Sequence, residues 1–179
     1  MDISQYVANT PMSTEFIGFG ESAIHNTVDR IHQIIKSSAF NPYVRKFTES
    51  LVIDLAPNDK IGELRAIHDF VKYKVRYTKD PYGMEYVQTP PLLLKQIEMK
   101  EQPAGDCDDM TTLTLSMMKS IGYPVATKIT SYSPNGKFSH IYGLVFVNNK
   151  WIPTDTTVRS RQLGWEAPGI TRMSEKEAR

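Results

Sequence analysis

The spacing of apolar residues changes once along this chain, near Gly122, and that change limits the folds open to it. Before Gly122, apolar residues recur every three or four positions, as in Ile24, Val28 and Ile31, which is the period of a helix. After Gly122 the apolar runs are short and strand-like, and Asn148-Asn149 separates two of them as a tight hairpin turn would. Helices followed by an antiparallel sheet predict an α+β domain.

Several helices are expected from this periodicity together with capping residues. Asn41 before Pro42 and Asp106 before Cys107 are typical N-cap positions, because a side-chain oxygen there can accept from a free backbone N–H group. The expected helices start at about Glu21 and at Pro42, cover 61–71 and 92–97, and run from Cys107 to about Ser120. Extended segments are expected at 73–77, 125–132, 140–147 and 150–154, with a turn at 80–83.

The chain is predicted to form one domain with an extension at each end. Its 179 residues are enough to bury a core without disulfides or metals. Residues 1–19 lack periodicity and are expected to form an extended arm. Residues 20–160 would form the folded domain, and residues 161–179 a polar C-terminal tail.

The composition argues against several classes of protein. The formal net charge is +1 and the basic residues are scattered, unlike a nucleic-acid binder with a basic face. No apolar run approaches the roughly 20 residues that span a bilayer, and the N-terminus lacks the features of a signal peptide. A single cysteine excludes an internal disulfide. We therefore expect a soluble protein of a reducing cytoplasm.

That single cysteine, Cys107, opens an expected helix in the run Gly105-Asp106-Cys107-Asp108-Asp109. Two interpretations are open. Free cysteines usually pack as small apolar residues, and Cys107 continues an apolar stripe with Met110 and Met117. A thiol in the first turn of a helix also lies at the positive end of the helix dipole. With a cationic imidazole nearby, its pKa can fall from about 8.5 toward about 3.5–7.5, which would make it a nucleophile.

His140 and Asp155 are predicted to meet across the hairpin at Asn148-Asn149. If that turn has two residues, Val147 pairs with Lys150, and counting outward places His140 and Asp155 on one face of the sheet. A carboxylate there could fix the tautomer of the imidazole. Cysteine, histidine and aspartate would then supply a nucleophile, its base and the group that orients the base. The other histidines are expected at the surface or at its boundary: His25, His32 and His68.

The acids around Cys107 have a structural and a functional interpretation. Asp106 can cap the helix, and Asp108 and Asp109 suit its first turn, where the helix dipole stabilises negative charge. Carboxylates beside a thiolate would raise its pKa. A calcium ion at Asp106 and Asp108 would remove that conflict, although the spacing does not match an EF-hand. One cysteine and four dispersed histidines argue against zinc, so no cofactor is predicted apart from this candidate calcium.

Three motifs in this order resemble the transglutaminase-like superfamily of cysteine enzymes with a papain-like fold. They are residues 105–109 leading a helix, Ser139-His140-Ile141-Tyr142 in a strand, and Trp151-Ile152-Pro153-Thr154-Asp155. The stretch 67–77 also looks like that family, and the likeness covers about residues 20–160, most of the chain. It is closest to short transglutaminase-like proteins of bacteriophages and prophages. The resemblance implies helices, with the cysteine at a helix N-terminus, packed on a C-terminal antiparallel sheet.

The resemblance also implies roles for the site residues. Cys107 would be the nucleophile, His140 the general base and acid, and Asp155 the residue that orients His140. A second donor to the oxyanion, beside the backbone N–H of Cys107, would come from upstream in the chain. The candidates are Gln88, Gln96 and Gln102.

Two departures from the family bear on activity. The family's animal enzymes have an aromatic residue directly after the cysteine, where this chain has Asp108, which argues against protein cross-linking. Its bacterial periplasmic proteases bind calcium through acids that flank the cysteine. Asp106 and Asp108 match those positions, but this chain has no secretion signal.

Two functions from different classes follow. The first is a phage-encoded cysteine hydrolase or acyltransferase that acts on an amide or peptide bond of a protein or peptide through Cys107, His140 and Asp155. The second is a virion structural or assembly component that keeps the fold for binding. Its arm at 1–19 and its tail at 161–179 would contact phage structural proteins. Both functions place the protein in the host cytoplasm or in a virion. Neither function involves binding to nucleic acid or to a membrane.

Overall fold

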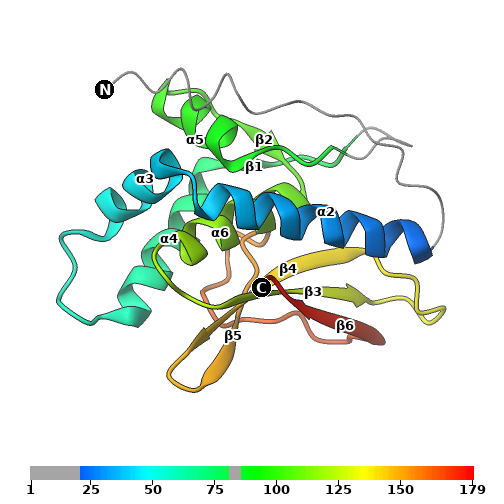
Figure 1. Ribbon diagram of the computed structural model, residues 1–179. Coiled ribbons are helices and arrows are strands. Elements are labelled where there is room, and N and C mark those ends of the chain that lie inside the picture. The colour runs from blue at the N-terminus through cyan, green and yellow to red at the C-terminus, as the bar shows by residue number, and fades with distance from the viewer. Residues whose placement is uncertain (1–20, 81–85) are drawn as a thin grey trace.

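Helices form one layer of the structure. The computed structural model describes residues 21–80 and 86–179 (Figure 1). Its helices are α2 (Glu21–Ala39), α3 (Pro42–Val52), α4 (Lys60–Lys74), α5 (Pro90–Glu98) and α6 (Cys107–Ser120), as the apolar periodicity predicted. Asn41 and Asp59 cap α3 and α4, because their side chains accept hydrogen bonds from the backbone N–H groups of Tyr43 and Gly62.

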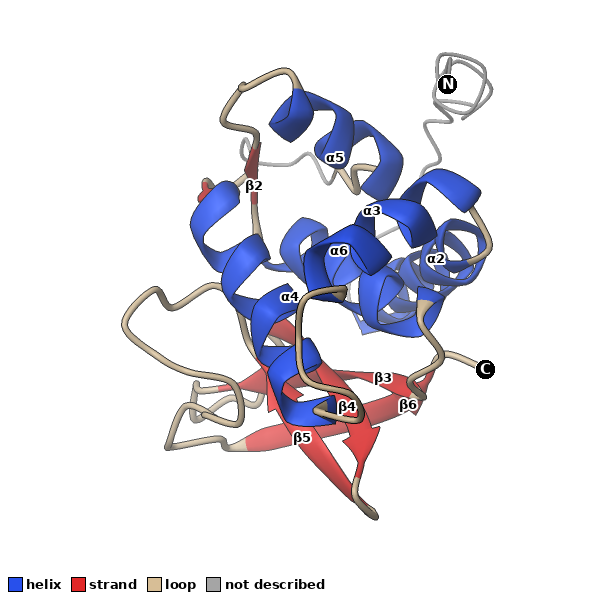
Figure 2. Ribbon diagram, turned by 90° about the vertical axis from the view of Figure 1, so that its left-hand side faces the viewer, coloured by secondary structure: helices blue, strands red, loops and turns tan. Residues whose placement is uncertain are grey.

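The centre of that layer is α6, which contacts α2, α3, α4 and α5 and rests on the sheet (Figure 2). Every residue in 108–118 is buried. Thr114 Oγ1 donates to the Met110 carbonyl one turn earlier at 2.7 Å, whereas the buried Thr112 hydroxyl has no hydrogen-bond partner among the described residues. A helix that is apolar or small on all sides belongs in a core. Because α6 is enclosed, the position of its first residue, Cys107, is fixed by its neighbours.

The second layer is an antiparallel sheet, and the helices lie on one face of it (Figure 2). Its strands are β3 (Val125–Ser131), β4 (His140–Val147), β5 (Lys150–Thr154) and β6 (Arg172–Glu177), in the order β5-β4-β3-β6. Val147 pairs with Lys150 across the predicted turn. Asn148 and Asn149 have φ values of 51° and 62°, as the favoured two-residue hairpin turn requires. The predicted α+β fold is confirmed.

Two segments differ from what the sequence led us to expect. The expected polar tail at 161–179 contains β6, which pairs with β3. This edge strand is exposed at almost every position, so it carries no apolar alternation that would reveal it. Of the extended stretch expected at 73–77, Arg76–Tyr77 alone is a strand, β1, because α4 continues through Lys74. The expected arm at 1–19 lies outside the described residues, as does most of the turn at 80–83.

Apolar side chains fill both faces of the sheet at its centre. The main core lies between the helices and the sheet, and a smaller cluster of Ala126, Tyr142 and Leu144 lies apart from it. The chain after β5 returns to that cluster, where Glu166 accepts hydrogen bonds from the Tyr142 hydroxyl (2.5 Å) and from Lys128 Nζ (2.8 Å). Within the described part of the chain, no helix combines the length and apolarity that crossing a membrane requires.

Gly143 lets α6 approach β4 closely. A Cβ at this position would lie 2.5 Å from Leu115 Cδ2 and closer still to Thr154 Oγ1. Near the start of β4, Thr111 Oγ1 of α6 donates to the Ile141 carbonyl at 3.2 Å. This contact between helix and strand brings the N-terminus of α6 to the part of β4 that carries His140.

Candidate active site

A pair of reciprocal hydrogen bonds fixes the helix start that carries Cys107. Asp106, the predicted N-cap, accepts from the Asp108 N–H at 3.1 Å, and Asp109 Oδ2 accepts from the Asp106 N–H at 3.3 Å. These carboxylates satisfy N–H groups that have no partner inside the helix. The structural interpretation of the acids is thus confirmed for Asp106 and Asp109.

Gln88 holds Asp109 from the segment before α5. Its backbone N–H donates to Asp109 Oδ1 at 2.6 Å, and its Nε2 donates to Asp109 Oδ2 at 3.0 Å and to the Ala104 carbonyl at 2.8 Å. Burial raises the pKa of Asp109 to about 6 despite these hydrogen bonds. Both hydrogens of the Gln88 amide are engaged, so this candidate oxyanion donor serves the helix start. Of the other candidates, Gln96 lies on α5 with its Oε1 buried, and Gln102 is exposed.

Cys107 is partly exposed and lies against the start of β4. The backbone N–H of Ile141, the residue after His140, is hydrogen-bonded to its sulfur. Burial and the Asp106 carboxylate raise the pKa of the thiol to about 12, and the N–H groups of Ile141 and of Cys107 itself oppose that rise. The direction is opposite to the one expected from the helix dipole, because desolvation and the adjacent acids outweigh it. The thiol therefore rests protonated near pH 7.

His140 and Asp155 meet as the hairpin count predicted. His140 Nε2 lies 2.8 Å from Asp155 Oδ2, while Asp155 Oδ1 accepts from the N–H and the hydroxyl of Thr157 at 3.0 and 2.7 Å. Burial favours the neutral acid, but the bonds from His140 and Thr157 prevail and hold the pKa of Asp155 below its usual value. An ionised carboxylate only accepts, so Nε2 of His140 carries the proton and Nδ1 remains free to take another.

A second histidine, His68, contacts the backbone carbonyl of Asp155. It is fully buried on α4, and its Nε2 lies 3.1 Å from the Asp155 carbonyl oxygen. Its Nδ1 lies 3.2 Å from Asp69 Oδ1, which also pairs with Lys72 Nζ at 2.6 Å. Burial lowers the pKa of His68, so it is neutral near pH 7. The surface or boundary position expected for His68 was wrong.

The signal that could have identified His68 was its place in the apolar stripe of α4. It follows Leu64 by four residues and precedes Val71 by three, on the buried side of the helix. Polar residues on such a stripe are buried with a partner. The remaining histidines agree with the expectation, since His25 is exposed and His32 is partly buried against Thr127 Oγ1 at 2.8 Å.

With this geometry in view, comparison with known proteins identifies the family. The family model of the transglutaminase-like superfamily matches residues 49–156, which include Cys107, His140 and Asp155. This chain belongs to the transglutaminase-like superfamily. No curated protein sequence matches it.

Solved structures share the fold of this superfamily member at low sequence identity. A candidate cysteine protease from Cytophaga hutchinsonii is 15% identical with a TM-score of 0.51, covering 78% of this chain and 46% of that one. A candidate protease from Parabacteroides distasonis is 12% identical with a TM-score of 0.54, covering 72% and 26%. LapG from Legionella pneumophila is 14% identical with a TM-score of 0.47, covering 84% and 81%. This chain spans less than half the length of the first two.

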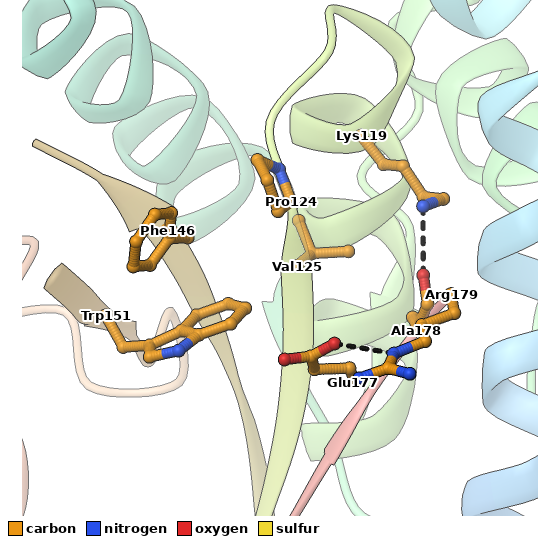
Figure 3. Close-up of a pocket in the computed structure, with 8 residues that line it drawn as sticks. All are labelled: Lys119, Pro124, Val125, Phe146, Trp151, Glu177, Ala178 and Arg179. Carbon is orange, nitrogen blue, oxygen red and sulfur yellow. Dashed lines mark hydrogen bonds and ion pairs between the residues drawn. The ribbon is translucent and has the colours of Figure 1, made fainter. Parts of the chain in front are cut away.

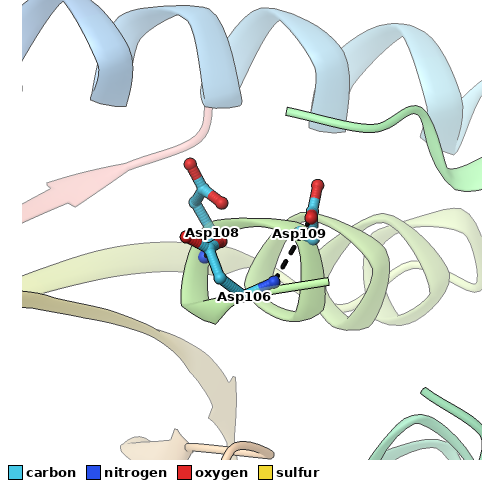
Figure 4. Close-up of side chains that lie close together, drawn as sticks. All are labelled: Asp106, Asp108 and Asp109. Atoms are coloured by element: carbon cyan, nitrogen blue, oxygen red, sulfur yellow. Dashed lines mark hydrogen bonds between the residues drawn. The ribbon is translucent and has the colours of Figure 1, made fainter. Parts of the chain in front are cut away.

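The acids at the helix start also lie close enough together to form a candidate cation site (Figure 4). One carboxylate oxygen each from Asp106, Asp108 and Asp109 lie within 4.8 Å of one another, and an all-oxygen set suits calcium rather than zinc. Asp106 and Asp109 already accept hydrogen bonds from the helix start and from Gln88. Capping therefore accounts for the arrangement of Asp106 and Asp109.

Two hollows on the surface lie away from these residues. One of about 290 Å³ is lined by Phe146, Trp151 and residues near the end of β6 (Figure 3). The other, of about 440 Å³, lies beside the hairpin turn at Asn148-Asn149 and the loop after α6. Since α6 runs from Cys107 to Ser120 and both hollows lie near its C-terminal end, neither is lined by the candidate catalytic residues.

Proposed function

We propose that this superfamily member is a cysteine hydrolase or acyltransferase that acts on an amide or peptide bond. The observation that carries the proposal is the 2.8 Å contact of His140 with Asp155, beside a thiol at a helix N-terminus. That contact orients the imidazole on the residue before Ile141, whose backbone N–H acts on the only cysteine of the chain. In these roles Cys107 is the nucleophile, His140 the base and then the acid, and Asp155 the orienting group.

The proton of the thiol sets the order of events. Because burial and Asp106 raise the thiol pKa to about 12, Cys107 attacks the carbonyl while His140 Nδ1 removes its proton. Asp155 stabilises the resulting imidazolium. The carbonyl oxygen becomes an oxyanion, which the backbone N–H of Cys107 stabilises. His140 then protonates the leaving amine, and a water or a second amine releases the acyl group from sulfur.

The descriptions of the structural neighbours as candidate proteases agree with hydrolysis of a peptide bond. At 15% and 12% identity these likenesses concern the fold, so the substrate class rests on the site itself. We also propose a phage origin, because the motifs at 105–109, 139–142 and 151–155 resemble those of the short phage and prophage branch.

A second candidate function is a non-catalytic virion or assembly component, possible partners being other phage structural proteins. The raised thiol pKa favours it, because a buried thiol beside acids is a poor nucleophile without help. In that case the fold would serve binding and the thiol would remain inert.

Alkylation of Cys107 separates the two functions. The chain has one cysteine, so mass spectrometry after iodoacetamide treatment reports that thiol alone. A thiol with a pKa of about 12 and no base would react at neutral pH about three orders of magnitude more slowly than free cysteine. With His140 as its base, we expect Cys107 to react at least as fast as free cysteine.

The variants make this test specific. We expect His140→Ala to slow alkylation by about 10²-fold or more, the range of general-base effects, and His25→Ala, at an exposed histidine, to leave it unchanged. Slow alkylation in the unaltered protein that His140→Ala does not change would refute the enzyme and support the binding component.

A further inference from the structure

Tyr77 is fixed beside the helix start that carries the nucleophile. It lies on β1, which pairs in parallel with β2 (Ala104–Gly105), and its partner in the register is Gly105. The Thr78 N–H donates to the Gly105 carbonyl at 2.9 Å. Because Gly105 is two residues before Cys107, this pairing places Tyr77 beside the segment that leads into Cys107.

The side chain of Tyr77 lies within electrostatic reach of the candidate site. Its hydroxyl is close enough to Cys107, Asp106 and Asp155 for their charges to act on it. Burial, followed by these charges, raises its pKa to about 12. The residue as a whole is 41% exposed, so a substrate can reach it. Tyr77 thus presents a protonated hydroxyl within electrostatic reach of Cys107.

That hydroxyl differs from those of other tyrosines whose pKa is raised. The hydroxyls of Tyr43, Tyr123 and Tyr142 each donate to a glutamate. Among the described residues, no hydrogen-bond acceptor engages the hydroxyl of Tyr77, a residue that is 41% exposed. Its donor is therefore available to a ligand.

The proposed reaction needs such a donor. The attack on a carbonyl creates an oxyanion near Asp106, Asp108 and Asp155, whose negative charges would oppose it. The backbone N–H of Cys107 can donate to this oxyanion. The side-chain amide of Gln88 instead donates to Asp109 and to the Ala104 carbonyl. A neutral phenol adds a hydrogen bond without adding a proton to the reaction.

We infer that the Tyr77 hydroxyl donates the second hydrogen bond to the carbonyl oxygen of the substrate, together with the backbone N–H of Cys107. This role rests on the proposed function. Tyr77 keeps its proton throughout, because the proton that reaches the leaving amine comes from the Cys107 thiol through His140. The interaction strengthens as the carbonyl oxygen becomes negative, so it accelerates acylation.

Comparing two reactions of the same thiol tests this role. Acylation by p-nitrophenyl acetate passes through an oxyanion, whereas alkylation by iodoacetamide displaces iodide from a methylene carbon and forms none. We expect Tyr77→Phe to slow acylation by about 10²-fold, the effect of removing one oxyanion donor, and to leave alkylation within about twofold. The control is Tyr73→Phe, at an exposed tyrosine on α4, which should change neither rate.

Each other result contradicts the inference in a distinct way. Unchanged acylation in Tyr77→Phe would show that its hydroxyl does not contact the oxyanion. An equal loss in both reactions would mean that Tyr77 acts on the thiol or on the fold. If the unaltered protein is acylated no faster than free cysteine, the proposed function fails and the role of Tyr77 fails with it.

Discussion

Asp155 is held at three points, and its precision as an orienting group follows from them. One carboxylate oxygen contacts His140, the other accepts two hydrogen bonds from Thr157, and the backbone carbonyl faces His68. None of these contacts depends on a side chain that is free to rotate in solvent. At the scale of the residue, the site is therefore rigid on the side of the base.

Changing Asp155 to Asn should disable the base while preserving the shape of the site. The amide oxygen would keep the bonds from Thr157, so the amide nitrogen would face His140 Nε2 and donate to it. The imidazole would then carry its proton on Nδ1, which could no longer accept the proton of Cys107. We expect p-nitrophenyl acetate to acylate the variant about 10²- to 10⁴-fold more slowly. An unchanged rate, with Asp54→Asn as the control, would argue against the triad.

His68 should matter for stability because it is fully buried between two acceptors. Replacing it with Leu keeps a similar volume but leaves the buried Asp155 carbonyl without its partner. The cost of such a group is about 1–3 kcal/mol, which urea unfolding would measure. A variant as stable as the unaltered protein would mean that water replaces the imidazole at that carbonyl.

At the scale of elements, the packing of α6 against β4 connects the thiol to its base. A Gly143→Ala change would force a methyl group into Leu115 and Thr154. We expect a loss of about 1–3 kcal/mol, as for other overpacked cores, seen as a lower urea midpoint. In a Leu115→Ala background the same change should cost less, because the clash with Leu115 is relieved and only that with Thr154 remains. Equal costs in the two backgrounds would contradict this account.

Local signals in the sequence were enough to predict most of these elements. Capping residues and helical periodicity located α6 from Cys107 to Ser120, and the Asn148-Asn149 turn fixed a register that brought His140 to Asp155. What the sequence did not reveal depends on distant pairing. β6 is a polar edge strand recognisable by its partner β3, and Tyr77 is brought beside Gly105 by a two-residue strand.

The sequence indicated opposing effects on the pKa of the thiol, but not which of them prevails. The helix dipole can be inferred from a helix start in the sequence, and it lowers a thiol pKa. The desolvation of Cys107 depends on everything packed around it, and together with Asp106 it reverses the direction. Electrostatics of a buried site follow from the complete fold rather than from the sequence near one residue.

At the scale of the whole molecule, His32 connects the helical layer to the inner strand β3 and the edge strand β6. It lies on α2, contacts Thr127 of β3, and is affected by Lys176 of β6 and by Asp29. Burial, followed by the charge of Lys176, lowers its pKa from 6.5 to about 4. Between pH 6.5 and about pH 4, His32 is therefore protonated in the unfolded chain but neutral in the folded protein.

The sign of the resulting pH dependence follows from this difference. Above pH 6.5 both states hold neutral His32, so it contributes full stability there; as the pH falls from about 6.5 to about 4, that stability is lost. His68 acts in the same direction. Asp109, with its pKa raised to about 6, acts in the opposite direction, because protonation relieves its burial. The pH dependence of the unfolding free energy therefore sums contributions of both signs. Comparing variants separates the contribution of His32 from the others.

His32→Gln provides that comparison, since the amide can still hydrogen-bond to Thr127 but does not titrate. We expect the unaltered protein to lose more unfolding free energy than this variant between about pH 7 and about pH 4.5. The difference should be about 1–2 kcal/mol after allowing for the partial exposure of the ring. Urea unfolding at a series of pH values measures it, with His25→Gln as the control at an exposed histidine. Parallel curves for the unaltered protein and His32→Gln would show that this contact between α2 and the sheet does not set the acid stability of the molecule.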